Sequence, residues 1–204
     1  KDTVPLTEDH LVVRSLRAGL AHAALAGGEP APPPGLHLTC HNAIPHGRGL
    51  GSSAAAIAVG LVLARGLLAE PDLLDDEAIF ALATAAEGHP DNASAALFGG
   101  CTLSWSDRAG HPHTLSLPVA PELRAVVCVP DVELATSRAR AMLPQLVPHA
   151  DAAFNAGRSA LLTHAIGHRL DLLLAATEDR LHQEQRAPAM PQTAALLAAV
   201  RAQG

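Results

Sequence analysis

The feature that most constrains this chain is a glycine-rich turn that runs directly into a predicted helix. Residues 47–53 read GRGLGSS, and residues 54–68 are rich in Ala, Leu and Val, which favour helix. Glycine has no Cβ atom, so the turn lets a ligand approach the backbone and leaves amide N–H groups free at the start of the helix. The turn therefore predicts an anion site, although glycine-rich turns with serine caps are common and this signal alone is weak.

The turn is not a Walker A loop, because that motif needs a lysine before its Ser or Thr and Lys1 is the only lysine in the chain. If the anion is a nucleotide phosphate, amides, arginine and a metal must neutralise its charge. Ser52 and Ser53 supply hydroxyls, one of which can bind Mg²⁺. Glu87, just before a Gly-His-Pro-Asp-Asn turn, is the candidate carboxylate ligand.

The rest of the chain mixes helical and strand patterns. Helical periodicity or capping signals predict helices over residues 7–26, 54–68, 76–87 with Asp75 as N-cap, 91–98 capped by Asp91 or Asn92, 136–146, 151–164, 169–181 and from 195 onward. Alternating or β-branched runs predict strands over residues 36–40, 101–106, 113–117 and 123–129, the last of them buried. A domain change fits best at Pro118–Pro121.

Composition narrows the class of protein. With 204 residues, 49% hydrophobic and 17% charged, the chain can form one core or two small domains. Its net charge of −6 and the lack of a dense Lys/Arg run argue against nucleic acid as a partner. The longest apolar stretch, residues 54–64, is shorter than the roughly 20 residues that cross a bilayer, and the start does not look like a signal peptide.

The three cysteines are Cys40, Cys101 and Cys128, an odd number without CxxC spacing. This argues against a disulfide framework or a zinc site and is typical of a reducing compartment. We expect them to be small core residues of a cytoplasmic protein.

Two motifs resemble those of a known family. Residues 45–55, PHGRGLGSSAA, resemble the phosphate-binding motif of the GHMP kinases, PxxxGLGSSAA, and match all its fixed positions. Residues 87–92, EGHPDN, followed by Gly99-Gly100, resemble the segment that marks homoserine kinases within that superfamily. Both motifs occur in the family's order, and the resemblance covers nearly the whole chain.

The resemblance implies a role for each matching residue. Ser53 and Glu87 would bind Mg²⁺, with Glu87 counted as catalytic for that reason. His89 and Asp91 would hold the polar end of L-homoserine, and Asp91 would pair with its ammonium group. The residues that would wrap the ATP phosphates are Pro45, Gly47, Arg48, Gly49, Leu50, Gly51, Ser52 and Ser53.

Two further matches concern arginines. Residues 136–140, TSRAR, resemble the family's TxxAR element, which places Thr136 and Arg140 one turn apart on a helix, with Arg140 gripping the substrate carboxylate or steadying the phosphoryl group. Arg186 is similar to a second family arginine that binds the amino-acid carboxylate, a task suited to a planar bidentate donor. The arginines expected to be merely solvated are Arg138, Arg158 and Arg169.

The implied fold is α+β with the two-domain GHMP kinase architecture. A domain like ribosomal protein S5 domain 2 would span residues 1–118 and carry the phosphate loop, and a ferredoxin-like domain would span residues 119–204. We expect the family's first strands to precede Lys1 and its GxGP-type motif to follow Gly204. The implied reaction is the direct in-line transfer of the γ-phosphoryl group from ATP·Mg²⁺ to L-homoserine, a step toward threonine, and no residue stands out as its general base. A homodimer is one expected assembly.

Three other interpretations stay open. Another GHMP kinase, acting on mevalonate, a sugar or shikimate, would share the fold and the phosphate loop, but the GHPDN segment argues against it. A non-catalytic nucleotide or metabolite sensor would have lost Glu87 or Ser53, and both are present. An α/β interaction scaffold leaves the clustering of glycine, serine, glutamate and aspartate unexplained.

Overall fold

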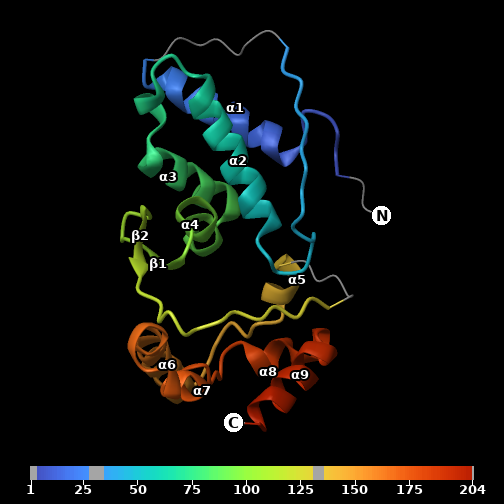
Figure 1. Cartoon of the computed structure of the whole chain (residues 1–204), viewed down its shortest axis with the longest axis vertical. Coiled ribbons are helices and arrows are strands. Elements are labelled where there is room, and N and C mark those ends of the chain that lie inside the picture. The colour runs from blue at the N-terminus through green and yellow to red at the C-terminus, as the bar shows by residue number, and fades with distance from the viewer. Residues whose placement is uncertain (1–3, 28–34, 131–135, 204) are drawn as a thin grey trace. The chain divides into compact units, whose positions relative to one another are not determined.

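A computed structural model describes residues 4–27, 35–130 and 136–203 and divides into two compact units (Figure 1). Unit 1 comprises residues 1–44 and 51–116, and unit 2 comprises residues 45–50 and 117–204. The elements of unit 1 are α1 (Leu11–Leu25), α2 (Ser52–Leu67), a 3₁₀ turn (Pro71–Leu74), α3 (Asp76–Glu87), α4 (Pro90–Phe98), β1 (Cys101–Ser106) and β2 (Pro112–Leu117).

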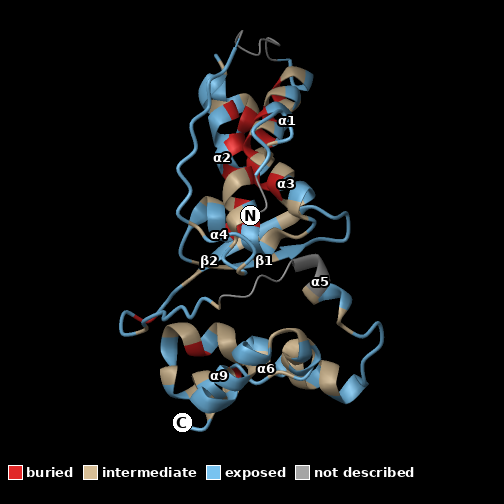
Figure 2. Ribbon diagram, turned by 90° about the vertical axis from the view of Figure 1, so that its right-hand side faces the viewer, coloured by how far each residue is buried: buried red, intermediate tan, exposed pale blue. Residues whose placement is uncertain are grey.

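Helix α2 is the centre of unit 1 and packs against α1, α3 and α4. Buried residues occur in α1, α2 and α3 where these helices meet, and they are coloured red in Figure 2. Phe80 of α3 meets Phe98 of α4 edge to face, with ring centroids 5.5 Å apart. The core cluster consists of Leu16, Ile57, Leu61, Ala64, Leu74, Ile79, Phe80, Ala83 and Ala93.

Small residues let α1 and α2 approach closely. A Cβ atom added at Gly60 would lie 2.7 Å from Ser15 Cβ and closer still to the carbonyl oxygen of Val12. A Cβ added at Gly19 would lie 2.7 Å from Ala64 Cβ. The axis-to-axis approach of the two helices therefore depends on glycine at both positions.

Helix ends agree with the predictions at α3 and differ at α1. The Asp75 carboxylate accepts a hydrogen bond of 2.8 Å from Ala78 N, and Gly88 ends α3 with a φ of +81°. Helix α1 begins at Leu11 rather than near Thr7, because His10 Nδ1 caps it by accepting from Val12 N at 3.2 Å.

Strands β1 and β2 form the predicted hairpin, and together they are the sheet found among the described residues. Asp107 organises its turn: Oδ1 accepts from Ala109 N at 2.9 Å and from His111 N at 2.8 Å. The backbone hydrogen bond from His111 is the main cause that lowers the pKa of Asp107 to about 2.

We predict that Asp107 titrates with a midpoint of about 2. Because its pKa is lowered from 3.8 on folding, the ionised carboxylate stabilises the hairpin above pH 3.8, and this stabilisation is lost as the pH falls through about 2. Carboxyl ¹³C shifts followed by NMR measure the midpoint directly. In denaturant the same carbon should titrate near the ordinary value of 3.8. A midpoint near that value in the folded protein would contradict the turn geometry.

Two predicted strands were wrong. Residues 36–40 and 123–129 have no regular secondary structure, and their side chains are largely exposed, Val126 to 86%. A strand needs a neighbouring strand to take up its backbone N–H and C=O groups, and β-branched residues alone cannot supply one. The prediction that the cysteines are core residues was also wrong: Cys40 and Cys128 are exposed, Cys101 is half-buried, and all three are free.

Unit 2 is helical in its described residues. It contains α5 (Thr136–Ala141), α6 (His149–His168), a 3₁₀ turn (Leu170–Leu172), α7 (Leu173–Ala176), α8 (Gln183–Arg186), a second 3₁₀ turn (Ala187–Ala189) and α9 (Pro191–Arg201). The helix expected over 151–164 is confirmed and is longer, whereas those expected over 136–146 and 169–181 are cut short. At Thr177 the side-chain hydroxyl bonds back to Leu173 O at 2.9 Å, and the chain leaves the helix there.

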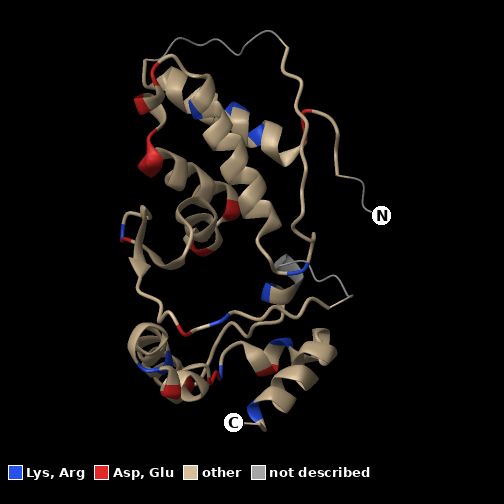
Figure 3. Ribbon diagram, viewed as in Figure 1, with Lys and Arg blue, Asp and Glu red and all other residues tan. Residues whose placement is uncertain are grey.

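Lys and Arg residues are scattered rather than gathered along the described ribbons of both units (Figure 3). The helices described in this structure include none whose length and hydropathy would let it cross a bilayer.

Candidate active site

The glycine-rich turn has the backbone conformation that its composition predicts. Gly47, Gly49 and Gly51 have φ values of 64°, 72° and 72°, all in the left-handed region. A Cβ at Gly49 or Gly51 would meet nothing within 4 Å, so the backbone angle, and not a lack of space, makes glycine necessary there. The left-handed alternation turns the chain tightly just before α2.

Gly51 is the N-cap of α2 and has no side chain with which to bond the first N–H groups of the helix. Ser52 is half-buried and Ser53 is exposed, so a hydroxyl lies beside these amides. With 16 residues, α2 has a full macrodipole whose positive end is at this turn. Amides, dipole and hydroxyl together make the start of α2 suitable for a phosphate group.

Glu87 is the last residue of α3, and the chain turns from it through Gly88 into α4. His89 is the N-cap of α4, and Pro90 is its first residue. The prediction that Asp91 or Asn92 caps this helix was therefore wrong, because proline tolerates the first helical position and starts α4 earlier. Asp91 lies in the first turn of α4.

His89 and Asp91 contact each other through His89 Nδ1 and Asp91 Oδ1. The carboxylate can only accept, so the imidazole nitrogen is the donor. The His89 side chain is 15% exposed and that of Asp91 is 70% exposed, so a half-buried ring holds an outward-facing carboxylate. The structure thus brings two predicted substrate residues together and leaves an anionic group open to a cation.

A buried hydroxyl network fixes this turn to the hairpin. Ser94, fully buried in α4, donates to Asp91 O at 2.8 Å. Its oxygen accepts from Ser104 Oγ at 2.7 Å and lies 2.9 Å from Thr102 Oγ1. The network satisfies a serine that burial would otherwise penalise, and it ties the backbone of Asp91 to β1. Nothing in the local sequence signalled it.

The predicted arginines belong to unit 2. Arg140 is exposed in α5, and Arg186 is half-buried at the end of α8, with its Nε buried and without a hydrogen-bond partner among the described residues. The side chains of Thr136 and Arg138 lie outside the described residues.

Arg169 was expected to be a solvated surface residue, and it is exposed, with its Nη2 2.7 Å from Asp171 Oδ2. The same expectation was wrong for Arg158. That side chain is half-buried, stacks 4.4 Å from the Phe154 ring and bonds Glu178 at 2.6 Å.

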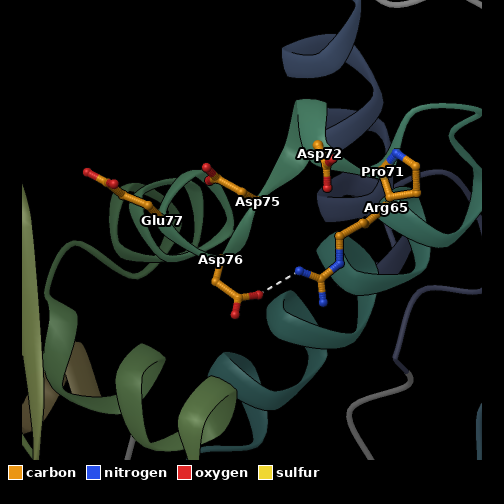
Figure 4. Close-up of a pocket in the computed structure, with 6 residues that line it drawn as sticks. All are labelled: Arg65, Pro71, Asp72, Asp75, Asp76 and Glu77. Atoms are coloured by element: carbon orange, nitrogen blue, oxygen red, sulfur yellow. Dashed lines mark hydrogen bonds and ion pairs between the residues drawn. The ribbon is translucent and has the colours of Figure 1, made fainter.

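A hollow of about 550 Å³ lies elsewhere in unit 1, at the start of α3 (Figure 4). None of the predicted site residues line it. Two of its carboxylates already have structural roles, since Asp75 caps α3 and Asp76 accepts a hydrogen bond of 2.5 Å from Arg65. The lining residues are Arg65, Pro71, Asp72, Asp75, Asp76 and Glu77.

Comparison with known proteins shows which family this chain resembles. The model of the GHMP kinases N terminal domain matches residues 10–100. A homoserine kinase from Streptomyces avermitilis is 52% identical over 204 residues, which are all of this chain and 65% of that protein. A homoserine kinase from Rhodococcus opacus is 45% identical over 216 residues and is covered to 67% of its length, with all of this chain aligned.

The chain belongs to the homoserine kinase family. A crystal structure of homoserine kinase from Cytophaga hutchinsonii superposes with a TM-score of 0.67 at 21% identity, covering 93% of this chain and 59% of that one, which confirms the GHMP kinase fold. The chain spans 65% of the length of the Streptomyces avermitilis protein, so the homoserine kinase sequence it matches extends beyond these 204 residues.

Proposed function

We propose that the full-length protein is a homoserine kinase, which transfers the γ-phosphoryl group of ATP to the side-chain hydroxyl of L-homoserine. The observation that carries this proposal is the 52% identity to a homoserine kinase along the whole chain. The left-handed glycine turn at the start of α2 and the His89–Asp91 contact add physical support, because one suits a phosphate and the other an ammonium group.

The phosphate loop, residues 45–53, holds the β- and γ-phosphates of ATP in this proposal. The amides at the start of α2, which no side chain caps, replace the lysine of a Walker A loop, and Arg48 adds a positive charge.

Ser53 and Glu87 hold Mg²⁺, a hard cation that takes oxygen ligands and is commonly bound by one or two carboxylates together with substrate phosphates. The donor set suits such an ion, because Glu87 offers a carboxylate and Ser53 a hydroxyl, and both are oxygen ligands. When bound, Mg²⁺ would neutralise charge on the phosphates.

The amino-acid end of homoserine is held by charge. Asp91 pairs with the ammonium group and is oriented by His89. Arg186 takes the carboxylate, Arg140 either takes the carboxylate too or steadies the phosphoryl group, and Thr136 completes this set. The residues position the acceptor hydroxyl in line with the γ-phosphorus, which lowers the barrier chiefly by orientation and charge stabilisation. Asp91 is occupied by the ammonium group, so we assign no general base.

The proposal extends to the domain organisation, the assembly and the cellular compartment of the protein. Residues 1–118 form the N-terminal ATP-binding domain and residues 119–204 the ferredoxin-like C-terminal domain, with a homodimer as one assembly. The protein works in the cytoplasm, where its free thiols at Cys40, Cys101 and Cys128 stay reduced.

A panel of acceptor alcohols tests the substrate. ADP release by the full-length protein with ATP and Mg²⁺ is compared for L-homoserine, mevalonate, galactose, shikimate and L-serine. Turnover confined to homoserine supports the proposal. Turnover on another alcohol keeps the phosphate loop but overturns the roles of His89, Asp91 and the arginines, and a protein that binds ATP without turnover on any alcohol is a sensor.

We predict that Arg140→Lys and Arg186→Lys raise the KM for homoserine by about tenfold or more and change the KM for ATP much less, because a point charge replaces a planar fork. Arg169→Lys, at an exposed pair with Asp171, is the matched control and should leave both constants unchanged. Steady-state kinetics with each substrate varied measures the effect. Equal rises in both KM values would remove these arginines from the substrate site.

A further inference from the structure

Asp179 joins helix α6 to the start of helix α8. It lies in the loop between α7 and α8, where its Oδ1 accepts from Asn155 Nδ2 of α6 at 2.6 Å. Its Oδ2 accepts from the backbone N–H groups of His182 at 2.7 Å and Gln183 at 2.6 Å. One carboxylate therefore ties a long helix to the first residues of a short one.

Arg186 follows one turn later on the same short helix. Its backbone N–H donates to His182 O at 3.1 Å. Helix α8 has only four residues, Gln183–Arg186, and a single helical turn has little stability of its own. Its direction, and with it the origin of the Arg186 side chain, is therefore fixed by the hydrogen bonds at its start.

The loop is held on α6 at neighbouring points too. Asn155 Oδ1 accepts from Arg180 N at 2.9 Å. The Arg158 and Arg180 guanidinium groups lie over the Phe154 ring, at 4.4 and 3.9 Å from its centroid. Burial alone would raise the pKa of Asp179, but the hydrogen bonds from Gln183, Asn155 and His182 outweigh burial and lower it, so the carboxylate is ionised at neutral pH.

We infer that Asp179, oriented by Asn155, is a positioning residue that fixes Arg186 for the carboxylate of the amino-acid substrate. This inference rests on the proposed function. A bidentate pair between guanidinium and carboxylate tolerates little misalignment, so the arginine must start from a fixed backbone position. The buried Nε of Arg186, unpartnered among the described residues, is a donor for which such a substrate would supply the acceptor.

An exchange of the two side chains separates this role from general stability. In Asp179→Asn, the new side chain has one accepting oxygen and one donating NH₂ group. The NH₂ group must therefore face another donor, either the Asn155 amide or the two backbone N–H groups. In Asn155→Asp, two carboxylates face each other. In the double variant Asn155→Asp/Asp179→Asn, the carboxylate placed on α6 accepts from Arg180 N and from the amide placed in the loop, whose oxygen accepts from the two backbone N–H groups. The exchange keeps every hydrogen bond.

We expect Asp179→Asn in the full-length enzyme to raise the KM for homoserine by about tenfold, the effect of one unsatisfied donor at a half-buried site, while kcat and the KM for ATP change less than about threefold. The exchanged double variant should return close to the parent. Asp171→Asn, which alters an exposed pair in the same unit, is the control and should match the parent. Asn155→Ala, which leaves Asp179 its two backbone bonds, is a milder variant, and circular dichroism monitors folding in all of them.

The outcomes distinguish this inference from the proposed function. If Arg186→Ala raises the KM for homoserine but Asp179→Asn behaves like the control, the positioning role is wrong and the substrate assignment stands. An exchanged variant as impaired as Asp179→Asn also overturns the role. Combining Asp179→Asn with Arg186→Ala should add little to Arg186→Ala alone, since the first acts through the second. A parent enzyme inactive on homoserine overturns the proposed function, and this inference with it.

Discussion

Glu87→Gln in the full-length protein should lower kcat by about 100-fold or more while the protein stays folded. The substitution keeps the size of the side chain and removes the negative charge that the proposal places beside Mg²⁺. Glu87 ends α3 and is half-buried, so an isosteric amide should not disturb the helix. ADP release at saturating ATP and homoserine, measured over a range of Mg²⁺ concentrations, gives kcat and the Mg²⁺ dependence.

Glu77→Gln is the matched control for this variant. Glu77 lies on the same helix, in its first turn, and is exposed, so its replacement should cost a few tenths of a kcal/mol in helix stability at most and leave kcat unchanged. A near-normal kcat in Glu87→Gln, with an unaltered Mg²⁺ requirement, would remove Glu87 from the metal site.

Gly60→Ala should destabilise the protein by about 2 kcal/mol, whereas Gly66→Ala on the same helix should stabilise it by about 0.5 kcal/mol. A Cβ at Gly60 would overlap α1 at Ser15 Cβ and Val12 O, and at least one of these contacts is backbone that cannot move aside. A Cβ at Gly66 would meet nothing within 4 Å, so only the better helix propensity of alanine acts.

Denaturant unfolding of the full-length variants, followed by far-ultraviolet circular dichroism, measures both changes. The opposite signs are the informative result, because both variants make the same substitution in one helix. If Gly60→Ala were as stable as Gly66→Ala, α1 and α2 would not approach as closely as the structure shows.

Elements whose signals are local could be predicted well. Asp75 and Gly88 mark the two ends of α3 through a side-chain cap and a left-handed residue, and both are confirmed. The glycine turn before α2 and the hairpin around Asp107 likewise depend on residues within a few positions of each other. Because the partners in such interactions are close in the sequence, a local pattern is enough to predict them.

Elements that depend on distant partners could not be predicted. Residues 123–129 look like a strand, but strand formation needs a neighbour that no local pattern supplies. Helix α7 ends at Ala176, and α8 begins after Asp179 has accepted hydrogen bonds from an N–H group of the loop and from an amide 24 residues earlier in the chain. Arg158 looked like a surface residue, because Glu178, with which it pairs, is 20 residues away.

The same division applies to the candidate site. The spacing of Glu87, His89 and Asp91 is visible in the sequence because all three lie within five residues, from the end of α3 to the first turn of α4. The buried Ser94 that anchors Asp91, and the Asn155–Asp179 pair that anchors Arg186, carry no motif and were found only from the contacts. Sequence identified the groups proposed to touch the substrate, and structure identified the groups that hold them.

The most direct test of the central proposal is ³¹P NMR of the full-length protein with ATP, Mg²⁺ and L-homoserine. We predict that the γ-phosphate signal of ATP is replaced by a phosphomonoester signal, O-phospho-L-homoserine, in equal amount to the ADP formed. Inorganic phosphate as the only new product, or ATP that remains intact in the presence of homoserine, would contradict the assignment of this protein as a homoserine kinase.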